Sequence, residues 1–186
     1  MTIGKTLYAS HRKVWRSWLK EHYKSEEEIW LIFYKKSAGK PNISYNDAVE
    51  EALCFGWIDS VRKGLDENSL AHRFTPRKPR SGYSQPNIER LRRMVSEEKV
   101  VDEVQRSVSE LLALPFEFPE DILSALKSDE EVWRNFNQYS SAYQRIRVAF
   151  VHDGRKREGE YEKRLANLVK KTKANKQYGY GIAAYY

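Results

Sequence analysis

Apolar residues recur at helical spacing near the start of the chain. Five large ones share one face of a 3.6-residue repeat: Val14, Trp15, Trp18, Leu19 and Tyr23. This spacing is typical of an amphipathic helix that buries one side. We therefore predict a helix over residues 10–22, with Ser10 at the N-cap, a position that serine favours.

A strand and a second helix are expected next. Residues 29–34 (IWLIFY) are rich in β-branched and aromatic side chains, which predicts a largely buried strand. Ser44, with Asp47 three residues later, has the arrangement of a helix N-cap. An apolar stripe then continues toward Gly56, a natural end for that helix.

Two further strand-like runs occupy residues 57–62 and 69–74, separated by KGLDEN. Their proximity predicts a β-hairpin with a longer loop. Joined to the earlier strand, the hairpin gives a small antiparallel sheet of about three strands. Ser84 and Pro86 then mark a helix start, so the fold class is α+β, a small sheet packed by helices and followed by an α-helical extension.

The segment LPFEFP at residues 114–119 interrupts helical periodicity with two prolines and is the best candidate for a linker. Apolar stripes beyond it predict further helices, one of them opened by Ser128 and Glu131 as a capping box. The expected division is an α+β core at 1–113, a linker at 114–119, a helical extension at 120–178 and a Gly/Tyr-rich tail at 179–186.

The single cysteine and the absence of long apolar runs bear on the compartment. Cys54 has no partner for an intramolecular disulfide, which is typical of proteins in a reducing environment. Its neighbours Leu53 and Phe55 favour a buried, unreactive thiol. No stretch has the length of a signal peptide or of a membrane span, so we expect a cytoplasmic protein.

The net charge of +7 is unevenly distributed. Residues 61–93 hold nine Lys or Arg against three Asp or Glu, and residues 143–178 hold eleven against four. Between them, residues 95–132 hold three basic and eleven acidic side chains. Two basic segments could attract an anionic partner if the fold brings them together; alternatively, the acidic segment neutralises them.

The first basic segment contains a candidate anion-binding loop. Four cations lie near Pro76 and Pro79: Arg73, Arg77, Lys78 and Arg80. Guanidinium groups on a rigid loop suit phosphate or carboxylate, and the helix start beyond it adds free N–H groups. The neutral donors expected beside them are Ser81, Ser84 and Asn87. The alternative is a structural ion pair of Arg73 or Arg77 with Asp59.

Asp59 is the one candidate for acid or base catalysis. It is expected on the same strand face as Trp57, and an indole beside a carboxylate could raise its pKa. Trp57 and Asp59 are also candidate ligand-binding residues. His72 is the only histidine nearby in the sequence, and no second catalytic partner is evident. No ligand spacing for a metal and no phosphate-binding glycine loop is present, so we predict no metal and no cofactor, and favour a binder over an enzyme.

Two other partners are open from the sequence. Tyrosines among the basic residues could stack on bases, which allows RNA or single-strand binding; equally, they could belong to core edges. A peptide could meet the acidic segment instead. The sequence leaves the oligomeric state open.

Several motifs in register resemble one protein family. They are Tyr34-Lys35-Lys36, the run from Ala52 to Ser60, and the run from Arg73 to Lys78 with Ser81, Ser84 and Asn87. In this order the chain resembles the YdeI/OmpD-associated (OmdA-like, "bacteriocin-protection") family. The resemblance implies a role in stress or antimicrobial-peptide tolerance and a helical extension, and it does not imply a reaction.

Overall fold

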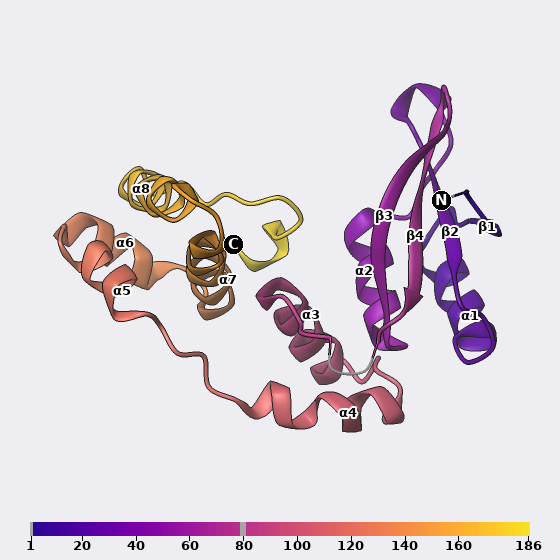
Figure 1. Ribbon diagram of the computed structural model, residues 1–186, viewed down its shortest axis with the longest axis horizontal. Coiled ribbons are helices and arrows are strands. Elements are labelled where there is room, and N and C mark those ends of the chain that lie inside the picture. Colours follow the sequence, from indigo (N-terminus) through magenta and orange to yellow (C-terminus); the bar gives the residue numbers. More distant parts are fainter. Residues whose placement is uncertain (1, 79–80) are drawn as a thin grey trace. The chain divides into compact units, whose positions relative to one another are not determined.

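The computed structural model describes residues 2–78 and 81–186 (Figure 1). The chain divides into two compact units, residues 1–83 with 90–112 and residues 84–89 with 113–186. We call these the N-terminal unit and the C-terminal unit and describe each by itself. The division at a linker over residues 114–119 stays a prediction.

The N-terminal unit contains a four-stranded mixed sheet. Its strands, in the spatial order β1-β2-β4-β3, are β1 (Thr6–Tyr8), β2 (Ile29–Tyr34), β3 (Trp57–Asp66) and β4 (Ser69–Pro76). Strand β1 runs parallel to β2, and the other pairs are antiparallel. The α+β class is confirmed, but the expected sheet of about three antiparallel strands is wrong. Strand β1 has only three residues, too few to carry an alternating pattern.

The β-hairpin is longer than its apolar residues indicated. Strand β3 continues through the predicted loop to Asp66, so that only Glu67 and Asn68 separate it from β4. Two register shifts, between Asp59 and Arg62 and between Gly64 and Asp66, interrupt the pairing. Polar residues are tolerated in β3 because it is an edge strand, with one side open to water.

Two helices, α1 (Arg12–His22) and α2 (Tyr45–Cys54), pack into the same core as the sheet. Sequence periodicity placed both helices correctly, except that α1 begins at Arg12 and not near Ser10. The apolar stripes of the helices and the strands supply fully buried side chains, among them Trp15, Leu19, Ile29, Leu31, Ala48, Ala52 and Phe74. A short 3₁₀ turn, η1 (Lys36–Ala38), lies between β2 and α2.

The residues that cap the helices agree only in part with the predicted caps. The Ser44 cap is confirmed, because its hydroxyl accepts a hydrogen bond from the N–H of Asp47 at 3.0 Å. The predicted Ser10 cap is wrong: α1 begins after His11, and no side chain caps it. In the C-terminal unit Asp129, and not Ser128, caps its helix by accepting from Glu131 and Val132.

Helices α3 (Gln85–Ser96) and α4 (Asp102–Ala113) complete the N-terminal unit from Arg90 to Leu112. They add Leu91, Met94, Val104 and Val108 to its core. Helix α3 starts directly after Ser84, as predicted, and the Ser84 carbonyl accepts hydrogen bonds from the N–H groups of Asn87 and Ile88.

The C-terminal unit is helical beyond Ala113. Its elements are α5 (Glu120–Lys127), α6 (Glu130–Gln138), α7 (Ser141–Asp153), the 3₁₀ turn η2 (Gly154–Lys156), α8 (Glu160–Lys173) and the 3₁₀ turn η3 (Ala183–Tyr185). The Gly/Tyr-rich tail belongs to its core, since Ile182 and Tyr185 are buried there. Within the described residues, no helix has the length and apolar character that crossing a bilayer requires.

Candidate functional site

The loop after β4 lines a surface pocket of about 230 Å³ within the N-terminal unit. Its lining comes from the loop, the end of α2 and one side of α4: Gly56, Arg77, Lys78, Ser81, Tyr83, Val104 and Ser107. Three predicted ligand residues, Arg77, Lys78 and Ser81, therefore share one pocket. Long-range packing against α4 supplies its other wall.

Gly56, which lines the pocket just before β3, has a backbone conformation that residues other than glycine rarely adopt. Its φ is +73°, and a Cβ there would lie 3.1 Å from a methyl of Val104. Its carbonyl accepts a hydrogen bond from the Arg77 N–H at 2.8 Å. A glycine at the end of α2 therefore lets the chain turn tightly and holds the beginning of the loop in place.

The Arg77 side chain is held by the loop itself. Its Nη2 donates to the carbonyls of Ser81 and Gly82, at 3.2 and 2.7 Å. The guanidinium carbon lies 3.7 Å from the centre of the Tyr83 ring, a cation–π contact. Arg77 is thus oriented by neutral groups, and its positive charge is not matched by these contacts.

Arg73 lies outside this pocket and is paired. Its Nε donates to Glu28 Oε2 at 2.7 Å, and its Nη2 forms an ion pair with the same oxygen at 2.5 Å. The hydrogen bond from Arg73 is the main cause of a lowered pKa for the Glu28 carboxyl. The alternative that Arg73 or Arg77 pairs with Asp59 is wrong, because Arg73 meets Glu28, and Arg77 meets the loop carbonyls.

Asp59 does lie on the core side of β3, opposite the buried Phe74. Its carboxylate accepts a hydrogen bond from the Tyr45 hydroxyl at 2.5 Å. His72 lies nearby, with its ring 5.1 Å from those of Tyr45 and Phe33. Burial lowers the pKa of His72, and the Asp59 charge opposes that shift. The arrangement ties α2 to the hairpin through Tyr45.

The other predicted ligand residues are dispersed. Trp57 is a core residue, 1 % exposed, and its Nε1 donates to the Tyr23 carbonyl at 3.0 Å. Ser84 and Asn87 belong to the C-terminal unit. Arg80 lies outside the described residues. Sequence proximity therefore identified the centre of the loop but could not determine which neighbouring side chains turn toward it.

A family model described as a domain of unknown function (DUF8412) matches residues 7–107, more than half of the 186 residues. The chain belongs to this family. The match spans the DUF8412 domain from β1 into α4, including the loop pocket with Arg77 and Lys78. The description of this family assigns it no function.

A second family model, described as "Bacteriocin-protection, YdeI or OmpD-Associated" (OmdA), matches residues 115–175. The resemblance to this family is confirmed. The match lies in the helical C-terminal half, whereas the motifs at 34–36, 52–60 and 73–78 fall within the DUF8412 match. No curated protein and no solved structure shows significant similarity to the chain.

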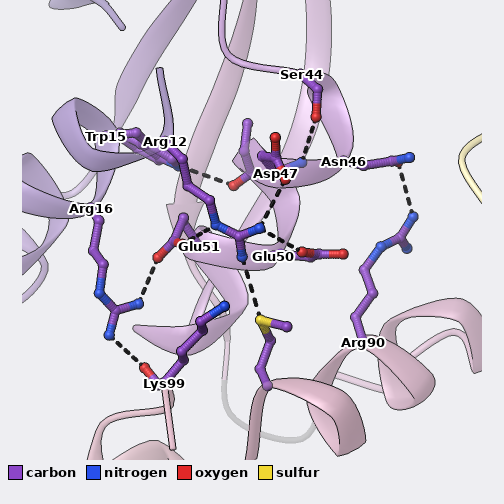
Figure 2. A network of polar contacts seen from close by, with 12 residues as sticks. Arg12, Trp15, Arg16, Ser44, Asn46, Asp47, Glu50, Glu51, Arg90 and Lys99 are labelled. Carbon is purple, nitrogen blue, oxygen red and sulfur yellow. Dashed lines mark hydrogen bonds and ion pairs between the residues drawn. The ribbon is translucent and has the colours of Figure 1, made fainter. Parts of the chain in front are cut away.

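The DUF8412 domain also contains a buried ion-pair network that the sequence analysis missed (Figure 2). The carboxylate of Glu51 pairs with Arg12 through one oxygen and with Arg16, at 2.6 Å, through the other. Glu50 pairs with Arg93 and lies 3.1 Å from Arg12. The network joins α1, α2 and α3.

The carboxylates of this network are buried, so their ion pairs hold the helices together. The side chains of Glu50 and Glu51 are only 5 % and 2 % exposed, and such charges need partners. Arg12 also meets Asp47 at 2.8 Å, so three acidic groups hold one guanidinium. A signal was present in the sequence: acidic residues 47, 50 and 51 lie at helical spacing on an otherwise apolar helix, and basic residues 12 and 16 are four apart on another.

The free thiol of Cys54 is buried in the DUF8412 domain. Burial raises the pKa of this thiol to about 11. The neutral thiol, which is the unreactive form, therefore predominates at neutral pH. We expect Ellman's reagent to modify Cys54 in urea and to leave it intact in the native protein at pH 7.5. Rapid labelling of the native protein would contradict this prediction.

Within the described residues, no group of three His, Cys, Asp or Glu could hold a metal ion.

Proposed function

We propose that the DUF8412 domain binds a small anionic group, phosphate or carboxylate, at the loop pocket of Arg77 and Lys78. The observation that supports this most is that the contacts of the Arg77 side chain include no carboxylate among the described residues. Among the described residues, its side-chain contacts are neutral carbonyls and the Tyr83 ring. The cation is oriented by the loop, which lowers the conformational cost of binding an anion.

The contrast with other arginines of the same unit strengthens the proposal. Arg12, Arg16, Arg73 and Arg93 each pair with a carboxylate. Arg77 instead lines a pocket with the exposed Lys78. The pocket also contains Ser81 and Ser107, whose hydroxyls donate to the carbonyls of Lys78 and Val104. Two cations in one hollow match the charge of a phosphate or carboxylate group.

A protective role is the physiological setting that we propose for this binding. The description of the C-terminal family names bacteriocin protection, and stress or antimicrobial-peptide tolerance in the cytoplasm follows from it as a proposal. The free thiol of Cys54 supports a reducing compartment. Binding of RNA or single strands is the second candidate, favoured by the Arg77–Tyr83 stack, which offers a cation beside an aromatic face.

The test compares Arg77→Met with Arg62→Met, an equal loss of charge at an exposed residue of β3. Isothermal titration with inorganic phosphate and with citrate would measure small-anion binding. We expect Arg77→Met to weaken binding about tenfold or more, because charge-assisted hydrogen bonds to the anion are lost. Arg62→Met should bind like the wild type.

Labelled single-stranded RNA and duplex DNA distinguish the second candidate. Fluorescence anisotropy across a salt series would show steeply salt-dependent binding that Arg77→Met removes if the loop contacts a nucleic acid backbone. Small-anion affinity that is the same in Arg77→Met and the wild type would refute the proposed site.

A further inference from the structure

Arg147 of α7 is a buried cation that meets no acidic partner among the described residues. Its side chain belongs to a residue that is only 4 % exposed. Among the described residues, no hydrogen-bond acceptor reaches its Nε or its Nη2. Arg145, two residues earlier in the same helix, is by contrast paired: it donates two hydrogen bonds to the Glu89 carboxylate, each of 2.7 Å.

Aromatic rings and the tail enclose the Arg147 guanidinium. Its central carbon lies 3.9 Å from the Tyr178 ring centre and 4.5 Å from that of Phe150. The backbone of Tyr178 is fixed, because its N–H donates to the Tyr143 hydroxyl at 2.8 Å. Gly179 follows at φ +140°, and a Cβ there would lie 3.3 Å from Arg147 Nη1 and 2.4 Å from the Ile182 side chain.

This environment leaves the positive charge undercompensated. Burying a guanidinium carries a large desolvation cost unless it is paired with an opposite charge and hydrogen-bonded. Cation–π contacts offset only part of that cost. An arginine in such a setting would gain from an anion far more than an exposed arginine would, because the interaction takes place away from water.

A pocket of about 300 Å³ adjoins Arg147, within the C-terminal unit. Apolar side chains form much of its lining, including Ile146, Phe150 and Ile182. Phe150 is 41 % exposed and Tyr180 is 88 % exposed, so two aromatic rings stand open to solvent at a pocket with a buried cation.

The remaining polar lining does not oppose an anion. Asp153 is the acidic side chain of the pocket, and its carboxylate pairs with Lys156 at 2.7 Å. Ser84 and Gln85, at the start of α3, contribute neutral groups from the same unit. An apolar hollow with a buried cation and few other polar groups is typical of a small-molecule site.

We propose that this pocket binds a small organic anion, with Arg147 as the counter-charge to its carboxylate or phosphate group and with Phe150 and Tyr180 against its apolar body. The site lies in the OmdA-matched half of the chain and is independent of the Arg77 loop. Either anionic group satisfies the same guanidinium chemistry, and the experiment separates them.

The probes are benzoate and phenyl phosphate, with uncharged benzyl alcohol as the neutral analogue. Binding to the full chain would be measured by saturation-transfer NMR and by titration of protein chemical shifts. The variant Arg147→Met removes the charge and keeps an unbranched side chain, and Arg147→Lys keeps the charge without the planar donor array. Arg157→Met is the matched control, because Arg157 is exposed and is not part of the pocket lining.

We expect the wild type and Arg157→Met to bind at least one anionic probe alike, and benzyl alcohol much more weakly. Arg147→Met should lose about tenfold or more in affinity, and Arg147→Lys should be intermediate. The preferred probe identifies the anionic group. The proposal would be overturned if neither anion bound saturably or if benzyl alcohol bound as tightly as the anions. It would also be overturned if Arg147→Met bound the anions as tightly as the wild type.

Thermal unfolding without any probe distinguishes this site from a structural role of Arg147. If the charge is held for a ligand, replacing it with an apolar side chain removes a desolvation cost, so the Tm of Arg147→Met should equal or exceed that of the wild type. A clearly lower Tm would show that Arg147 serves the fold and would count against the site. Loss of Arg77-dependent phosphate binding would leave this result untouched, so the two proposals fail separately.

Discussion

Replacing Glu51 with glutamine is expected to destabilise the protein by about 3 kcal/mol, at the lower end of the cost of breaking a buried ion pair. Glu51 is almost fully buried and pairs with both Arg12 and Arg16. The amide keeps the shape but loses the charge, and its NH2 group replaces one of the two acceptor oxygens and faces a guanidinium that donates as well. The arginines are about a third exposed, at 29 % and 35 %, which moderates the loss.

The free energy of unfolding would be measured from urea transitions followed by circular dichroism, with the Tm as a second readout. For a chain of this length, about 3 kcal/mol corresponds to a fall in Tm of roughly 6–12 °C. Glu103→Gln is the control, because Glu103 pairs with Lys24 at 2.9 Å on the surface, where water screens the pair, and its loss should change stability little. Equal stabilities of the two variants would show that the buried network contributes little.

Replacing Trp15 with alanine should cost about 4 kcal/mol, within the range for truncating a buried aromatic residue. Trp15 is fully buried, and its ring centre lies 5.3 Å from those of both Trp18 and Phe74. Its Nε1 donates to the Ala48 carbonyl at 3.0 Å. The substitution therefore removes contacts from α1 to α2 and to the sheet, and leaves a cavity that the surrounding elements can fill only in part.

The control for this prediction is Trp133→Ala in the C-terminal unit. Trp133 is only partly buried, so truncation removes less apolar area from the core, and we expect about half the cost or less. Urea transitions measured in the same way would compare the two. A loss below about 1 kcal/mol for Trp15→Ala would show that the helix α1 contributes little to the core.

Local patterns predicted the elements whose signals are local. The run at 29–34 forms β2, the stripe that includes Trp15 forms α1, and Ser44 caps α2 as expected. In each case the residues that carry the signal are neighbours in the chain, and one face or one cap satisfies them. The three-residue β1 and the true length of the β3–β4 hairpin lacked such signals, because pairing with β2 and β4 forms them.

The same distinction applies to the candidate site. Proline spacing and basic residues indicated that the loop after Phe74 carries Arg77, Lys78 and Ser81. Nothing local showed that Gly56 and α4 would close a pocket around them. Nor did it show that Arg73, four residues before Arg77, would turn to Glu28, which is 45 positions away in the sequence. Capture by a distant carboxylate is decided by the pairing of β2 with β4.

The sequence by itself determined the α+β class, most helices, the buried character of Cys54 and the position of the basic loop, because periodicity, capping and composition act over a few residues. Only the tertiary structure decided which charges are paired. It gave Arg12 and Arg16 the buried Glu51, tied Asp59 to Tyr45, and left Arg147 enclosed by rings with no acidic partner in the described part of the chain. The cause is physical: an ionic side chain is satisfied by whatever long-range packing brings within a few ångströms, and a linear pattern does not encode that distance.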